Sequence, residues 1–287
     1  MKRFNLALVC AGALFTGACD KSGEDAILAP VVPTASTRFF AAASDTTATD
    51  WRFVDQIEYS PTMIQMAFRG FSPYQPTAPG PRHFRLFTSY PTDFFAANPN
   101  TTALSTPMLD TTLTFTANAH YTMAYAGRAR AGGTPAAKFF LYTDDFTDPG
   151  TSISLRVINL DNDLATVDVY TSTTACAAPL GTPLVAGMAF GAASAYTVRA
   201  VGAFNVCFTA AGSATVLANV AAPVGAAGDK LNDLTALGGS SQASSVMAAF
   251  LLPRAAAGSP AVISTGTSAN ITPTIFFLID KNPPRGF

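Results

Sequence analysis

The chain has 287 residues, with 17 basic and 18 acidic side chains and a formal net charge of −1 at pH 7. Its residues are 49% hydrophobic and 12% charged, which excludes an intrinsically disordered chain, because disorder requires low hydrophobicity and high charge. The near-zero net charge argues against a nucleic-acid-binding protein, which needs a basic surface to neutralise phosphates. The 21 glycines and 20 prolines favour short strands and turns over long helices.

Residues 1–18 have the pattern of an export signal, in which two basic residues precede an apolar run that ends at Phe15. The run is too short to span a bilayer, which takes about 17–25 residues. Small residues then lead into Cys19 and resemble the lipobox of bacterial lipoproteins, although Thr16 stands where the lipobox usually has Leu. In that motif the signal peptidase cuts before the cysteine, which then carries lipid. The alternative is an ordinary signal peptide, with Cys19 as an unpaired thiol.

We therefore expect an exported protein of the bacterial cell envelope, lipid-anchored through Cys19 at the outer membrane or the periplasmic face. Residues 19–35 are expected to be a flexible tether, because they mix Gly, Ser, Pro and charge without periodicity.

The remainder of the chain contains an internal repeat. Ser36–Phe40 matches Ser154–Ile158 at an offset of 118 positions, and several later residues recur in the same order with an offset that only grows. These further pairs are Asp45 with Asp163, Asp50 with Asp168, Tyr74 with Tyr196, and Phe139–Leu141 with Phe276–Leu278, each triplet soon followed by an aspartate, Asp144 or Asp280. The repeat predicts two homologous units, 36–150 and 151–287.

Within each unit, apolar and polar residues alternate with period two, as in Ile153–Val157 and Phe204–Phe208, which indicates strands. No charged residue lies between 200 and 228, but glycine, proline and asparagine interrupt this stretch, so strands are expected there rather than a membrane helix. Turn clusters separate the runs. The predicted fold is all-β, with two tandem antiparallel β-sandwich domains of immunoglobulin-like architecture.

Leu155–Asn159, a short Asp-containing turn, and Val167–Tyr170 together resemble the opening of the domain of unknown function 4397 family. Asn118–Gly127 resembles a later strand of that family. Members occur, often in tandem, in bacterial envelope lipoproteins. The resemblance implies small β-sandwich modules without assigned catalytic residues, and it adds no chemistry.

Cys176 and Cys207 are 31 positions apart and are expected to form a disulfide, because an envelope compartment permits one. We expect the bond near the surface of the sheet, where it would tie in the loop 171–183. Two free buried thiols are the alternative.

The sequence lacks the G-x-S-x-G and H-E-x-x-H motifs of hydrolases, and its two histidines, His83 and His120, are interpreted as surface residues of strands. Asp161 and Asp163 are weak candidates for a metal site, but Asx residues at this spacing more commonly cap a turn. Asp144, Asp145 and Asp148 are interpreted as the solvated edge of a linker.

Exposed aromatic rings bind sugars in many carbohydrate-binding modules. Trp51, Tyr74 and Tyr90 are weak candidates for such a role, because they lie in or beside irregular stretches.

Together these features predict a non-catalytic envelope lipoprotein with a structural or binding role and without a cofactor or metal. Its expected partners are the membrane, through the N-terminal lipid, and an envelope polymer or surface protein, but not nucleic acid. The alternative is a hydrolase that acts on envelope or extracellular polymers.

Overall fold

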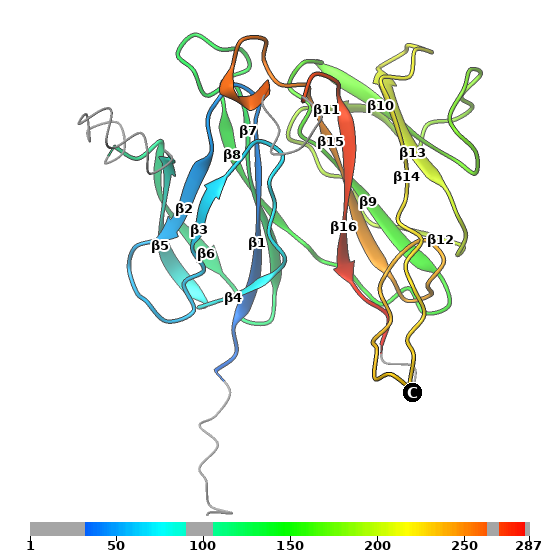
Figure 1. Ribbon diagram of the computed structural model, residues 1–287, viewed down its shortest axis with the longest axis horizontal. Coiled ribbons are helices and arrows are strands. Elements are labelled where there is room, and N and C mark those ends of the chain that lie inside the picture. The colour runs from blue at the N-terminus through cyan, green and yellow to red at the C-terminus, as the bar shows by residue number, and fades with distance from the viewer. Residues whose placement is uncertain (1–31, 90–105, 263–269, 285–287) are drawn as a thin grey trace, which may run out of the picture. The chain divides into compact units, whose positions relative to one another are not determined.

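The structure is a computed structural model that describes residues 32–89, 106–262 and 270–284. The described residues form sixteen strands and one short 3₁₀ helix, η1 (Pro260–Val262), as Figure 1 shows. The strands are β1 (Ala35–Ala43), β2 (Thr49–Phe53), β3 (Met63–Met66), β4 (Gln75–Thr77), β5 (Gly80–Thr88), β6 (Leu109–Phe115), β7 (His120–Gly127), β8 (Lys138–Thr143), β9 (Ile153–Asn159), β10 (Thr166–Ser172), β11 (Val185–Ala189), β12 (Thr197–Arg199), β13 (Asn205–Ala210), β14 (Ala218–Ala221), β15 (Val246–Leu252) and β16 (Thr274–Lys281).

The strands form four sheets of four, two in each half of the chain. The first half has the orders β4-β1-β7-β8 and β3-β2-β5-β6, and the second has β12-β9-β15-β16 and β11-β10-β13-β14. Each strand of the second half therefore has the same place in its sheet as the strand of the first half whose number is eight lower. The all-β fold with two sandwiches, predicted from the period-two patterns, is confirmed.

One feature of the sheets differs from the prediction. β1 pairs with β7 in parallel, and β9 pairs with β15 in parallel, while the other named pairs are antiparallel. The two sandwiches are therefore mixed rather than purely antiparallel. In each of these two pairs, the neighbouring strands begin at the same end of the sheet and run in the same direction.

Three large apolar cores hold the described part of the chain together, beside a small cluster of Phe68, Ala255 and Ala261. One lies inside the first sandwich around Trp51 and Phe84, and another lies inside the second around Val169 and Phe208. The third joins the sandwiches, and includes Phe40 from the first and Phe250 from the second. Their ring centroids are 4.6 Å apart. Thr34–Phe287 is consequently one compact unit.

The sheets that meet at this third core, β4-β1-β7-β8 and β12-β9-β15-β16, have apolar side chains on both faces. All seven residues of β9 and all seven of β15 are buried. The sequence of β15, Val-Met-Ala-Ala-Phe-Leu-Leu, is a continuous apolar run, as expected for a strand covered on both sides.

Both sandwiches point the same way, so that the starts of β1 and β9 lie at one end. Arg38, near the start of β1, contacts Asp280 near the end of β16, and Ser44, after β1, donates a hydrogen bond to Asn162, after β9, at 3.2 Å. We call the end where β1 and β9 begin the proximal end and the opposite end the distal end. The linker 144–152 crosses between the halves at the proximal end.

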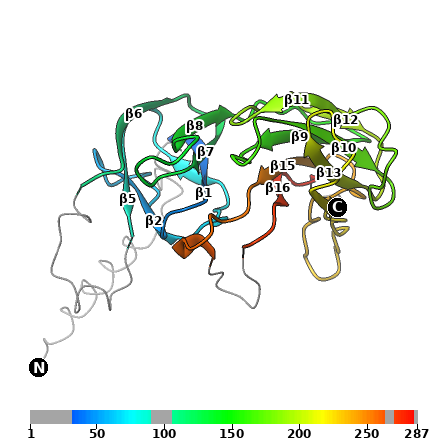
Figure 2. The same cartoon turned by 90° about the horizontal axis from the view of Figure 1, so that it is seen from above.

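The connection between β14 and β15, residues 222–245, also lies at the proximal end (Figure 1). The equivalent connection in the first half, between β6 and β7, has only residues 116–119. Figure 2 shows the same strands from above. In the part of the chain that the structure describes, no helix has the length and apolar character needed to cross a membrane.

Candidate functional site

A network of buried charges lies where the two sandwiches meet, toward the proximal end. Arg38 of β1 and Asp280 of β16 form an ion pair at 2.6 Å. Arg156 of β9 pairs with Asp144, the residue after β8. The pairs are crossed between the halves. Arg38, on the first strand of the first half, binds Asp280, near the end of the last strand of the second half. Arg156, on the first strand of the second half, binds Asp144, just after the last strand of the first half. Two cations and two anions compensate one another out of water.

Two tyrosines complete each side of the network. The Tyr74 hydroxyl donates to Asp144 at 2.5 Å, and the Tyr196 hydroxyl donates to Asp280 at 2.6 Å. The guanidinium of Arg38 lies 4.7 Å from the ring of Tyr74, and that of Arg156 lies 4.9 Å from the ring of Tyr196. These distances suit cation–π contacts. Each aspartate is thus held by an arginine from across the interface and a tyrosine from its own half.

The two sides differ at one position. Thr122 on β7 receives a hydrogen bond from Arg38 Nε at 2.7 Å and donates one to Asp144 at 2.6 Å. Its counterpart on β15, opposite Arg156, is Ala248. Burial opposes the charge on Arg38, but Asp280, Tyr74 and Asp144 outweigh it and raise the pKa of the guanidinium. Burial also raises the pKa of Tyr74 and of Tyr196, so both phenols remain protonated donors.

The network holds the sandwiches together, and solvent does not reach its charged groups. Asp144 is buried, so the interpretation of Asp144 as part of a solvated linker edge is wrong. Tyr74 is half-buried beneath Arg38 and is not an exposed platform for sugars. The two arginines, two tyrosines and two aspartates of the network were all visible in the sequence, as members of the repeat or as the aspartates that follow it, whereas Thr122 was not. Arg38 and Arg156 each place a charge inside an otherwise apolar strand, and this was the sign in the sequence that these residues form one buried network.

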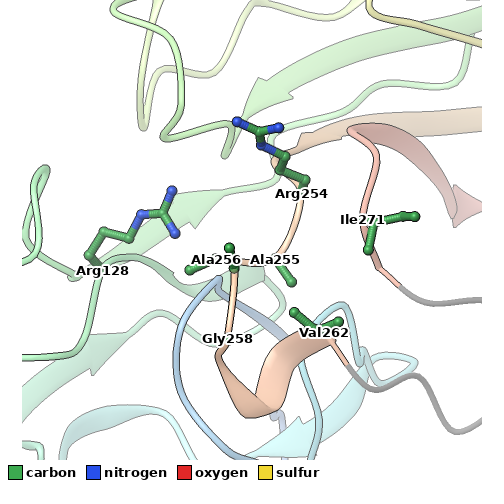
Figure 3. A pocket seen from close by; sticks show the side chains of 8 residues that line it. Arg128, Arg254, Ala255, Ala256, Gly258, Val262 and Ile271 are labelled. Carbon is green, nitrogen blue, oxygen red and sulfur yellow. The ribbon is translucent and has the colours of Figure 1, made fainter.

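A hollow of about 490 Å³ lies at the distal end, between connections of the two halves (Figure 3). Arg128, from the β7–β8 connection, and Arg254, from the β15–β16 connection, stand beside it. Its other walls are apolar or small, from Ala255–Gly258, Val262 and Ile271. The β15–β16 connection is fixed onto the first half, because the Ala256 amide donates to the Ser44 carbonyl at 2.7 Å.

Asp163 stands between the two arginines of the hollow. It forms an ion pair with Arg128, and its other oxygen lies 3.6 Å from Arg254 Nε. The side chain of Arg254 is 67% exposed. One carboxylate thus faces two guanidinium groups, which leaves an excess of positive charge beside an apolar hollow. Such a site suits a ligand with an anionic group and an apolar body.

Asp161 and Asp163 form a turn, as the alternative to a metal site predicted. The Asp161 amide donates to Asn159 Oδ1 at 2.9 Å, and the Asp163 amide donates to Asp161 Oδ1 at 2.8 Å. Among the described residues, no three His, Cys, Asp or Glu side chains converge as metal ligands. Burial raises the pKa of Asp161 to about 6, because its hydrogen bond from Asp163 and the more distant Arg128 and Arg69 offset only part of the desolvation.

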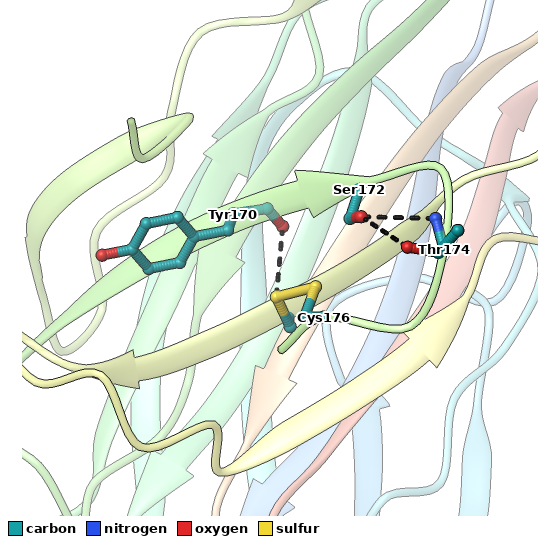
Figure 4. Close-up of a disulfide and its surroundings, with 5 residues drawn as sticks. Tyr170, Ser172, Thr174 and Cys176 are labelled. Carbon is teal, nitrogen blue, oxygen red and sulfur yellow. Dashed lines mark hydrogen bonds between the residues drawn. A yellow bond between two sulfur atoms is a disulfide. The ribbon is translucent and has the colours of Figure 1, made fainter. Parts of the chain in front are cut away.

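The disulfide between Cys176 and Cys207 is present, with a Cα–Cα distance of 6.4 Å (Figure 4). Cys207 is fully buried, which differs from the expected position near the sheet surface. The Cys207 side chain points to the outer face of its sheet, as expected. The loop after β10 crosses that face with Cys176 and covers Cys207. The Ser172 hydroxyl accepts a hydrogen bond from the Thr174 amide at 3.3 Å where this loop begins.

The other candidates do not form a binding or catalytic site. Trp51 is 0% exposed in the first core and donates to Thr49 Oγ1 at 2.8 Å, so it is no sugar platform. Tyr90 and the predicted lipidation site Cys19 lie outside the described residues. His83 pairs with Asp110 on the outer face of the first sandwich, whereas His120 packs against Tyr74, with ring centroids 5.2 Å apart.

Comparison with known proteins identifies a family but no activity. Residues 35–170, from β1 into β10, match the family model described as "Domain of unknown function (DUF4397)". No curated protein matches the sequence. A solved structure described as "Alpha-glucan binding by a streptococcal virulence factor" has 10% identity and a TM-score of 0.21, over 65% of this chain and 87% of that chain. This likeness is too low to carry an argument. Residues 35–170 thus match the domain of unknown function 4397 family, and this match covers just under half of the chain.

Proposed function

We propose that the protein is a non-catalytic, lipid-anchored component of the bacterial cell envelope, and that it binds an acidic envelope polymer at the distal hollow. The observation that carries the proposal is the pair Arg128 and Arg254 beside an apolar hollow, with only Asp163 between them. An acidic polysaccharide presents both carboxylate groups and apolar sugar faces, and so it matches this chemistry.

The buried network supports a binding role rather than a catalytic one. Its two arginines and two aspartates hold the halves together and are buried away from solvent. The distal connections therefore belong to one compact unit, and a preorganised site lowers the entropic cost of holding a ligand. The predicted anchor at the other end of the chain would keep the protein at the membrane.

The test is retention of the mature full-length protein on immobilised acidic envelope polysaccharide and on peptidoglycan. Arg254→Ser should weaken retention about tenfold or more, because a charge-assisted hydrogen bond contributes about 1.5–3 kcal/mol. Arg52→Ser is the matched control, since Arg52 is also exposed but lies on the outer sheet beside Asp50. Failure of the wild-type protein to bind either polymer would count against the proposal. Release of soluble fragments from the polymer would instead favour the hydrolase alternative.

A further inference from the structure

Two connections at the proximal end expose large apolar side chains. Ile57, in the β2–β3 connection, is 97% exposed, and Leu231, in the β14–β15 connection, is 92% exposed. We define the proximal apolar surface as these two residues together with Tyr59, Val224, Leu234 and Leu237, all of which are exposed. The two connections belong to different sandwiches, so this surface consists of two separate groups of exposed apolar side chains at the same end of the molecule (Figure 1).

Hydrogen bonds hold both connections in place. In the second half, the Ala226 amide donates to the Leu237 carbonyl at 3.0 Å, and the Gly238 amide donates to Asn282 Oδ1 at 2.7 Å. In the first half, the Ala78 amide donates to the Tyr59 carbonyl at 2.9 Å. The apolar side chains are therefore presented to solvent by fixed backbone. The connection 222–245 also has no counterpart of similar length in the first half, which marks it as an addition to the repeated unit.

The charges beside this surface are mainly acidic. Asp55, Glu58, Asp229 and Asp233 lie in the two connections, against the single base Lys230. Asp55 is compensated by an ion pair with Arg82 at 2.9 Å. The surface therefore has no electrostatic attraction for anionic lipids or polyanions, and its apolar groups suit the interface of a zwitterionic bilayer.

The position of this surface points to the membrane as its occupant. β1 begins at Ala35 at the same end, and Cys19 is only 16 residues earlier. Sixteen residues span at most about 50–60 Å when fully extended. A lipid on Cys19 would thus attach the described part of the chain to the bilayer at its proximal end.

We propose that the proximal end is a membrane-contact surface, on which Ile57, Leu231 and their neighbours enter the interface of a zwitterionic bilayer. The inference rests on the proposed lipid anchor. It gives the protein a fixed orientation, with the distal hollow directed away from the membrane.

The test places an environment-sensitive fluorophore, nitrobenzoxadiazole, on single introduced cysteines of the mature full-length protein, with the native disulfide intact. The variants are Leu231→Cys, Ile57→Cys and, as a distal control, Ala131→Cys, an exposed residue of the β7–β8 connection. Peptide mapping confirms the labelled position, and circular dichroism confirms the fold. Each protein is added to phosphatidylcholine vesicles with and without brominated acyl chains.

With vesicles, emission from positions 231 and 57 should shift to shorter wavelength and be quenched by the brominated lipid, while position 131 stays aqueous. Aqueous emission from both proximal probes overturns the inference. Insertion of only one of them, or of the control, also overturns it, because the two connections must face the bilayer together. Mass spectrometry of the same preparation reads the lipid on Cys19. Missing lipid therefore refutes the anchor, whereas aqueous probes on lipidated protein refute only the contact surface.

Discussion

The crossed ion pairs allow a quantitative test of how the two sandwiches are joined. Arg38→Met removes a buried cation that pairs with Asp280 at 2.6 Å and lies 3.8 Å from Asp144. Two carboxylates then remain buried against Arg156 alone. Removing one partner of a buried ion pair costs about 3–5 kcal/mol, because the other charge stays uncompensated. At about 2–4 °C per kcal/mol for a unit of this size, the melting temperature should fall by about 6–20 °C.

The double variant Arg38→Met with Asp280→Asn separates pairing from packing. It removes one charge of each sign and keeps an acceptor for the Tyr196 hydroxyl, so the remaining Arg156–Asp144 pair is balanced. We expect the double variant to recover about 2–3 kcal/mol relative to the sum of the single variants. Guanidinium unfolding followed by the fluorescence of Trp51, the single tryptophan, measures each free energy of unfolding.

The matched control is Arg52→Met, because Arg52 pairs with Asp50 at 2.8 Å at the surface. A surface ion pair contributes about 0–1 kcal/mol, so this variant should be nearly unchanged. Additive losses in the double variant, within about 0.5 kcal/mol, would show that Arg38 and Asp280 are not coupled and that the reasoning is wrong.

Three further predictions follow from the same structure. Reducing the Cys176–Cys207 bond, which closes 31 residues, should lower the free energy of unfolding by about 3–4 kcal/mol; an unchanged denaturation midpoint with reductant would contradict this. Because burial raises the pKa of Asp161 to about 6, above its unfolded value, Asp161 favours folding when protonated, and this contribution is lost as pH rises through about 4–6. Asp161→Asn removes this titration, so its free energy of unfolding relative to that of the wild type should rise by up to about 3 kcal/mol between pH 4 and pH 7. An equal change with pH in both proteins would refute the assignment. The fragment 36–150 alone exposes Phe40 and leaves Arg38 without Asp280, so it should show no cooperative thermal transition in circular dichroism; a sharp transition would mean that the interface is dispensable.

The internal repeat allowed much of the fold to be predicted, because repeated local patterns impose the same strand order. One alignment was off by a residue. In the structure, Phe140 lies opposite Ala124 and Phe276 lies opposite Phe250, so Phe140 corresponds to Phe276 rather than to Phe277. This register also makes Asp144 the counterpart of Asp280. A shift of one residue moves a side chain to the other face of a strand, which is why the triplets alone did not reveal the crossed pairs.

The packing between the halves could not be predicted from period-two patterns. Alternation describes a strand with one face in water, but β9 and β15 are buried on both faces, and Ala248 and Phe250 contact the other sandwich. The same packing explains why Asp144, a polar residue in a linker, is buried. Trp51 was misjudged for a related reason, since its neighbours in the sequence are polar whereas its neighbours in space are Phe39 and Phe84.

The crossed network has the form of the interface between two identical subunits, in which residue i of one meets residue j of the other and j meets i. Here the linker 144–152 joins both partners covalently, so their association no longer depends on protein concentration. In this single chain, a substitution at the interface changes only one of the two repeats. In a homodimer the same substitution would change both subunits. Thr122 and Ala248 already differ in this way, and the two faces of the interface are therefore free to diverge while the pairing that aligns them is kept.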